Sequence, residues 1–320
     1  MDAGHNLHPG NPHVPQRFKG SQSLVSESGA IPSGEIKHLV TVNHPISMKK
    51  SLITIFLLSS VAAFAQETLS PAGAVNVSGK QRMLSQRMGK DYMCLHSGIQ
   101  PEAAQRELTT SQIIFDENLK ALKLFAPNDI IKAKLNRQEE LWKKYRELLN
   151  QPFADRNNAQ NVLDMNSQVL TAAEDAVQEI VKYVSILPSK NETITGATVA
   201  KNTNISGRVR MLSQRLTLYY IAYVNGIGEP TSSLAVMKES AEKIQGIMSN
   251  LMTSEINTTD IDESIGDVII DWRQIEERCT VDNCLNFEKK SVDPKNMFLI
   301  TNRIVGKTDK VVGMYAKLLD

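Results

Sequence analysis

Apolar side chains recur every three or four residues along most of the chain after residue 70, which is the period of an α-helix with one buried face. Prolines and glycines divide this pattern into segments. We therefore predict four helices in the first half, over about 70–95, 103–125, 128–149 and 155–187, and four in the second, over about 198–224, 231–252, 260–279 and 294–319. No stretch alternates with period two for long enough to form a sheet. The pattern predicts an all-α fold made of two tandem four-helix bundle units.

Capping residues indicate where three of these helices begin. Ser70 precedes Pro71, and a serine cap followed by proline at the first helical position is a common helix start. Asn128 and Asp155 each follow a proline by one to three residues and can accept hydrogen bonds from the next turn. The predicted starts therefore rest on side-chain chemistry as well as on periodicity.

The first 65 residues differ from the rest of the chain. Residues 1–47 hold five of the six His and five of the 12 Pro and show no helical or strand period, so we interpret them as a disordered or misassigned upstream extension. Residues 48–65 combine Met-Lys-Lys, a short apolar run and an Ala-Phe-Ala end, the pattern of a secretory signal peptide. A transmembrane anchor is the less favoured alternative, because a span needs about 20 apolar residues. Since a signal peptide must be N-terminal, we expect translation to start at Met48.

Removing residues 1–65 leaves 255 residues with 31 Lys and Arg against 32 Asp and Glu. This near-neutral balance disfavours nucleic-acid binding. The remaining chain has a single histidine, His96, and three cysteines. Zinc sites built from His and Cys, Ser-His-Asp triads and Cys-His dyads all need residues that are nearly absent. We predict no enzyme activity, no metal site and no cofactor.

The three cysteines have a simpler interpretation in an exported protein. Cys279 and Cys284 are close enough in sequence to close a short loop by a disulfide, with Cys94 as a buried free thiol. A redox role for the pair is the less favoured alternative.

A thirteen-residue motif occurs twice. Residues 76–88, NVSGKQRMLSQRM, align with residues 204–216, NISGRVRMLSQRL, with nine of thirteen positions identical and an offset of 128. Trp142 and Trp272 occupy matching positions at a similar offset of 130. A collinear series of matches indicates duplication of a whole unit of about 125 residues. We therefore predict one helical unit over 66–190 and a second over 191–320.

The repeated polar residues lie on one side of the motif helix. At about 100° per residue, Gly79, Arg82 and Gln86 fall opposite the apolar stripe, with Met83 beside them. The second motif has the same face, formed by Gly207, Arg210, Met211 and Gln214. A solvated face would account for the arginines and glutamines. It would not account for a glycine inside a helix, which costs about 1 kcal/mol relative to alanine and lets a backbone or a ligand approach closely.

Both motifs resemble the P-box of the PilJ-type domain, the sensory N-terminal domain of type IV pilus methyl-accepting transducers, and are similar to the periplasmic domain of nitrate/nitrite sensors of the NarX kind. The resemblance implies an antiparallel four-helix bundle that dimerises through its P-box helices. It also implies that Arg82 and Arg210 bind nitrate or nitrite, with Gly79 and Gly207 allowing close approach. Arg87 and Arg215 match a second family arginine whose part is less direct.

One chain holds both motifs, so we expect them to face each other as an intramolecular pseudo-dimer with one small anion between Arg82 and Arg210; a homodimer is the other arrangement. No stretch after Ala65 approaches about 20 apolar residues, so the predicted location is periplasmic or secreted, and a membrane-bound partner would carry the signal onward. The alternative function is a non-sensory structural or adhesion scaffold whose arginine face docks on a protein partner.

Overall fold

The structure is a computed structural model of the chain, and it describes residues 68–188, 194–281, 284–288 and 291–318. The predicted upstream extension at 1–47 and the predicted signal peptide at 48–65 lie outside the described residues. No helix of the described part is long and apolar enough to cross a bilayer.

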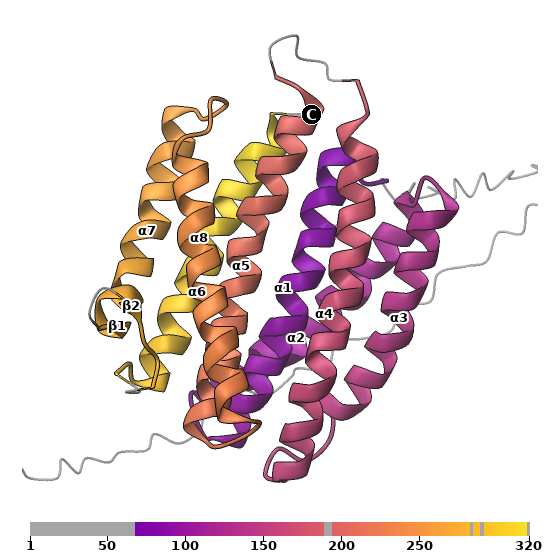
Figure 1. Cartoon of the computed structure of the whole chain (residues 1–320). Coiled ribbons are helices and arrows are strands. Elements are labelled where there is room, and N and C mark those ends of the chain that lie inside the picture. The colour runs from indigo at the N-terminus through magenta and orange to yellow at the C-terminus, as the bar shows by residue number, and fades with distance from the viewer. Residues whose placement is uncertain (1–67, 189–193, 282–283, 289–290, 319–320) are drawn as a thin grey trace, which may run out of the picture. The chain divides into compact units, whose positions relative to one another are not determined.

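The described residues form eight α-helices, which confirms the predicted all-α class and each predicted helix to within a few residues (Figure 1). Their bounds are α1 (Pro71–His96), α2 (Pro101–Phe125), α3 (Asp129–Leu149), α4 (Arg156–Ser185), α5 (Gly196–Val224), α6 (Pro230–Met252), α7 (Thr259–Cys279) and α8 (Pro294–Lys317). The sequence did not predict the small antiparallel hairpin after α7, formed by β1 (Thr280–Val281) and β2 (Cys284–Leu285). Strands of two residues are too short to produce a readable period.

The predicted caps are present at the helix starts. The side chain of Ser70 accepts a hydrogen bond from the backbone N–H of Gly73, and Asn128 accepts one from Ile131. Asp155 caps α4 in the same way. Each cap satisfies one of the backbone donors that a helix leaves unpaired in its first turn.

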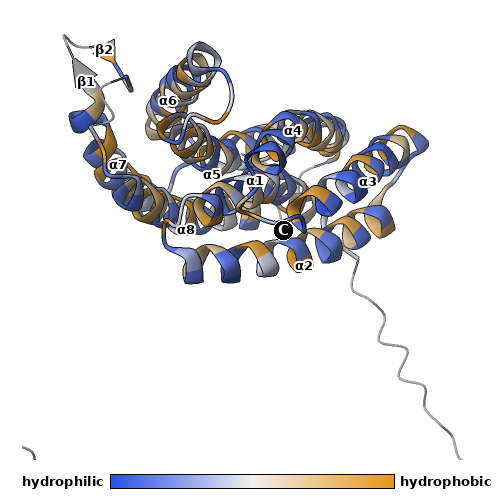
Figure 2. Ribbon diagram, turned by 90° about the horizontal axis from the view of Figure 1, so that it is seen from below, coloured by the Kyte–Doolittle hydropathy of each residue, from blue (hydrophilic) through white to orange (hydrophobic). Residues whose placement is uncertain are grey.

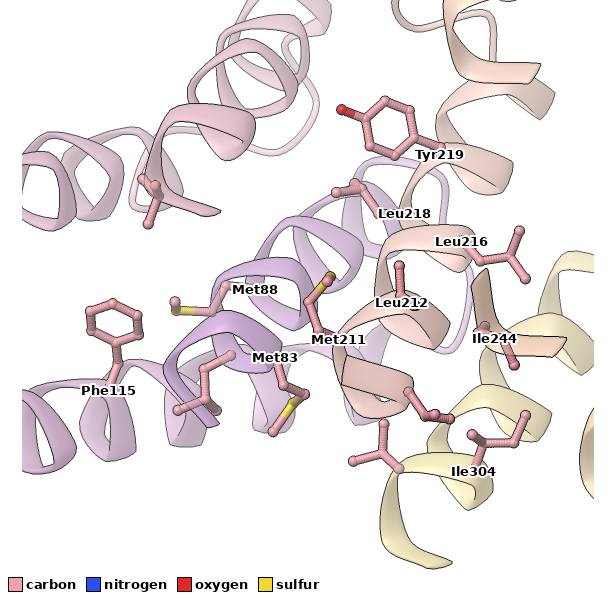
Figure 3. Packing of buried hydrophobic residues seen from close by; sticks show 14 of the residues in the cluster. Met83, Met88, Phe115, Met211, Leu212, Leu216, Leu218, Tyr219, Ile244 and Ile304 are labelled. Carbon is pink, nitrogen blue, oxygen red and sulfur yellow. The ribbon is translucent and has the colours of Figure 1, made fainter. Parts of the chain in front are cut away.

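The helices form two groups of four that meet along a central pair. In the first group α1 packs against α2 and α4, and α4 packs against α3; in the second, α5 packs against α6 and α8, and α8 against α7. The most extensive contact between any two helices joins α1 to α5, which lie between the outer helices when viewed end-on (Figure 2). Met83 and Met211 lie among the buried side chains at this contact (Figure 3). One hydrophobic core therefore runs through both groups.

The buried positions of the two groups correspond. The six buried residues of α2 recur in α6 exactly 129 positions later, from Ala104 and Ser233 to Leu122 and Leu251. Most buried positions of α4 recur in α8 at an offset of 135, as Val162 and Met297 illustrate. Corresponding helices thus bury corresponding faces.

The two buried tryptophans differ in their polar contacts. Trp142 donates its indole N–H to Asp116 at 2.7 Å, and Asp116 also accepts from Arg146 at 2.7 Å. Trp272 is equally buried, but its indole nitrogen has no hydrogen-bond partner among the described residues. Gln245, which stands 129 positions after Asp116, bonds to Glu276 instead. Both groups therefore have a polar bond between their second and third helices, but only in the first group does the buried indole N–H take part in it.

We expect Asp116→Ala to lower the free energy of unfolding by about 1–3 kcal/mol, because it leaves the buried N–H of Trp142 unpaired. The matched control is Gln245→Ala, which removes no bond to Trp272 and should change stability by less than about 0.5 kcal/mol. Urea unfolding followed by circular dichroism measures both. Equal losses in the two variants would show that the indole bond contributes nothing.

Candidate functional site at the contact of the two motif helices

Arg82 on α1 and Arg210 on α5 are both completely buried where the two motif helices meet. An atom at the Cβ position of Gly79 would lie 3.4 Å from Nη2 of Arg210 and 3.5 Å from Nη2 of Arg82. The same position on Gly207 would lie 3.1 Å from Nη2 of Arg210 and 3.8 Å from Nη2 of Arg82. The structure thus brings together the four residues Gly79, Arg82, Gly207 and Arg210. Both guanidinium groups occupy space that the two glycines leave open.

Each arginine forms an ion pair with an acidic residue on another helix of its own group. Nη1 of Arg82 lies 2.7 Å from Oε2 of Glu174 on α4. Nη1 of Arg210 pairs with Oδ1 of Asp309 on α8. Asp309 stands 135 residues after Glu174, the offset that relates the buried positions of these two helices. The two ion pairs are therefore equivalent contacts in the two groups.

Each arginine is also bound by the asparagine that begins the opposite motif. Nη2 of Arg82 donates to the side-chain oxygen of Asn204 at 2.8 Å and to its carbonyl oxygen at 3.3 Å. Nη1 of Arg210 donates to the side-chain oxygen of Asn76 at 3.2 Å. Sequence analysis did not select these asparagines, although their identity in both motifs was a readable signal. The bonds cross from one motif helix to the other and fix their register.

Several donors of the pair remain without partners. Nε and Nη2 of Arg210 and Nε of Arg82 are buried and have no hydrogen-bond partner among the described residues. Burial lowers the pKa of both guanidinium groups, an effect that Glu174 and Asp309 oppose. Repulsion from Arg208 and Arg210 lowers the pKa of Arg82 further. The two arginines therefore keep unused donors in a buried region, although a carboxylate balances the charge of each.

The other predicted site residues lie near the arginine pair but make different contacts. Oε1 of Gln86 accepts from Nη1 of Arg215 at 3.2 Å, which is a further bond between the motif helices. Gln214 donates to the carbonyl of Thr301 at 3.4 Å. Arg87 is partly buried, and its Nε has no partner among the described residues. The roles of these side chains in binding stay predictions.

A cavity of about 250 Å³ opens between α4, α5 and α6 beside the pair. Its lining includes Glu174, Arg208, Met211 and Arg215. One oxygen of Glu174 binds Arg82, and the other accepts from Arg208 at 3.0 Å. Glu174 therefore stands between the cavity and the buried guanidinium group of Arg82.

The cysteines do not add to this site. Cys94 and Cys279 are buried, and neither forms a disulfide with a described residue. The side chain of Cys284 lies outside the described residues, so its predicted disulfide with Cys279 stays a prediction. Among the described residues, no group of three or more His, Cys, Asp and Glu side chains is arranged to hold a metal ion.

The arrangement can be compared with known proteins. Residues 65–168 match the PilJ family model, described as the N-terminal domain of type IV pili methyl-accepting chemotaxis transducers. The match covers the first motif and most of the first group of helices, and the second motif at 204–216 lies outside it. A chemotaxis transducer is a sensory protein, so the match indicates a sensor-type role with a signalling partner or a dimer. No curated protein and no solved structure matches the chain.

A second charged cluster lies further along α1, where the two motifs diverge. Nζ of Lys90 lies 3.0 Å from Asp91 and 2.9 Å from both Glu107 on α2 and Asn302 on α8. Apart from this contact with Lys90, neither oxygen of Asp91 has a hydrogen-bond partner among the described residues. Burial raises the pKa of Asp91 to about 7, although the charge of Lys90 opposes this. The fold therefore disfavours the ionised carboxylate.

This cluster predicts an unusual dependence of stability on pH. The pKa of Asp91 is higher in the folded state than in the unfolded state, so the contribution of Asp91 to stability is fully present below its unfolded pKa of about 4 and is lost as the pH rises through about 7. The carboxyl groups whose pKa the fold lowers, such as Glu174 and Asp271, finish titrating below this range. We expect the protein to be about 2 kcal/mol less stable at pH 8 than at pH 5. Urea unfolding across this range measures the slope, which Asp91→Asn should flatten; an unchanged slope in the variant would contradict the assignment.

Proposed function

We propose that the protein is an exported sensory protein that holds one small oxyanion, of the nitrate or nitrite class, between Arg82 and Arg210. The chain would act as an intramolecular pseudo-dimer of two PilJ-type units and would pass its occupied state to a membrane-bound signalling partner. Support for the duplicated arrangement comes from the repeated motif and from the matching burial patterns of α2 with α6 and of α4 with α8. The match at residues 65–168 supports the sensory role.

One observation carries the choice of ligand. Two buried guanidinium groups approach the same two glycines, and Arg210 keeps two unpaired donors there. A planar oxyanion offers oxygens to both guanidinium forks and neutralises their mutual repulsion. The glycines let both guanidinium groups come close to the two helix backbones, where an added Cβ on Gly207 would lie only 3.1 Å from Nη2 of Arg210. The ligand expected from this geometry is therefore small, planar and singly charged.

Binding requires an exchange of partners. Glu174 and Asp309 already neutralise the two arginines, so an incoming anion must replace at least one carboxylate. The cavity beside Glu174 offers a route from solvent to Arg82. Replacing the carboxylate of Glu174 by a free ion would remove the ion pair that joins α4 to α1. This would couple occupancy to a change in helix packing, as a sensor needs.

The same ion pairs support a second candidate function. If Glu174 and Asp309 are the permanent partners of the arginines, the network is structural and the protein is a helical scaffold that docks on a protein partner. The two candidates differ in whether a free anion stabilises the protein. A ligand at 100 times its dissociation constant should add about 2.7 kcal/mol of stability.

Titration calorimetry with sodium nitrate should show one anion bound per chain, and either Arg82→Ala or Arg210→Ala should weaken binding by at least about 100-fold. Arg82→Lys keeps the positive charge but lacks the paired N–H donors of the guanidinium group. Weak binding in a folded Arg82→Lys variant would therefore show that the anion site, and not the fold, has been lost. The control Arg303→Ala removes a half-exposed arginine of α8 that pairs with Asp271, and it should bind as the wild type does.

Two independent anions per chain would refute the pseudo-dimer. No stabilisation by nitrate, nitrite or a small carboxylate would favour the scaffold.

Glu174→Gln should raise the affinity for nitrate by about tenfold, because it removes the charge that competes for Arg82. The control Asp175→Asn changes the next residue of α4, an exposed carboxylate paired with Lys134, and should leave affinity unchanged. Calorimetry on both variants makes the comparison. Unchanged or weaker binding in Glu174→Gln would show that Glu174 does not compete with the anion.

A further inference from the structure

The outer helices of the two groups carry opposite charge. Helix α3 has six basic and four acidic residues, whereas α7 has two basic and seven acidic residues. These helices occupy corresponding places, α3 against α4 and α7 against α8. The corresponding surfaces of the two groups are therefore complementary in charge rather than alike.

A groove runs between α2 and α3. It contains two cavities, of about 430 and 330 Å³, which share Arg146. The larger one is lined by Lys120, Lys123, Lys143 and Arg146 against the acidic residues Asp116 and Glu139. Leu119, Leu124 and Trp142 supply its apolar lining, and Leu124 is 53% exposed. The groove thus has an apolar floor and a net positive rim.

Helix α7 presents an acidic stripe to solvent. Glu263, Asp267, Ile270, Gln274 and Glu277 follow one another at helical spacing on one face. Ile270 is 59% exposed at the centre of this stripe, and Arg273 and Arg278 lie at its edges. An exposed isoleucine between carboxylates is the composition expected of a helix face that fits a basic groove with an apolar floor.

The two surfaces are also compatible in length. The acidic stripe from Glu263 to Glu277 is about 21 Å long, which is short enough to lie within the groove. The groove follows α2 from Gln105 to Leu124, which spans about 30 Å. Within one chain, α3 and α7 lie on opposite sides of the central pair α1 and α5 (Figures 1 and 2). The groove of a chain therefore cannot be filled by its own α7.

We propose that the α2–α3 groove of one chain binds the acidic face of α7 of a second copy. The groove and the stripe are different surfaces, so each chain has one of each, and repeated contact produces head-to-tail assemblies, either open chains or closed rings. One helix face offers less than the ~800 Å² per partner that stable complexes bury. The association is therefore weak and depends on concentration and on salt.

Sedimentation velocity of the purified protein at about 0.5 mM tests this. In about 20 mM salt the sedimentation coefficient should rise with protein concentration, and in about 500 mM salt the association should weaken by at least about tenfold. Monomers under both conditions would overturn the proposal, as would association that strengthens with salt.

Charge reversal identifies the two surfaces. Lys120→Glu with Lys143→Glu disables the groove, and Glu263→Lys with Asp267→Lys disables the stripe; each double variant alone should be monomeric. In their equimolar mixture an intact groove meets an intact stripe, and the reversed groove is again complementary in charge to the reversed stripe, so the mixture should recover association. The control, Lys295→Glu with Lys310→Glu, makes the same charge change at two exposed lysines of α8 and should associate like the wild type. A mixture that stays monomeric, or double variants that still associate, would refute the assigned surfaces.

Discussion

The burial of two arginines at the contact of α1 and α5 constrains the rest of the fold. Removing a guanidinium group from water costs several kcal/mol unless nearby groups compensate its charge. Arg82 obtains that compensation from Glu174 on α4 and Asn204 on α5, and Arg210 from Asp309 on α8 and Asn76 on α1. These contacts involve the four helices α1, α4, α5 and α8. A shift of any one of them along its axis would leave a buried charge without a partner.

Much of this could be predicted from the sequence, because the signals were local. Ser70, Asn128 and Asp155 indicated helix starts, and each forms the expected cap. The repeated motif identified Arg82 and Arg210 because a glycine precedes each by three residues. Such patterns depend only on spacing within one helix, which the sequence displays directly.

The partners of the arginines could not be predicted in this way. Glu174 is followed by Asp175 and Glu179 on the same helix, and the sequence does not tell which carboxylate faces α1. The choice follows from how α4 packs against α1, which is a property of the assembled core. The β1–β2 hairpin was missed for a different reason, since its strands are two residues long.

If the chain arose by the proposed duplication, its centre has stayed symmetric while its two sides have diverged. The two arginine networks correspond residue by residue, because each supplies a partner to the other and a change in one would unbalance both. About two helical turns beyond the arginines this restraint is absent. There, Lys90 and Asp91 of α1 correspond to Leu218 and Tyr219 of α5. In a dimer of identical chains, both subunits would contain the buried Lys90 and Asp91. In the proposed pseudo-dimer only the first unit contains them, so one side can acquire a pH-dependent cluster without changing the arginine site that both sides share.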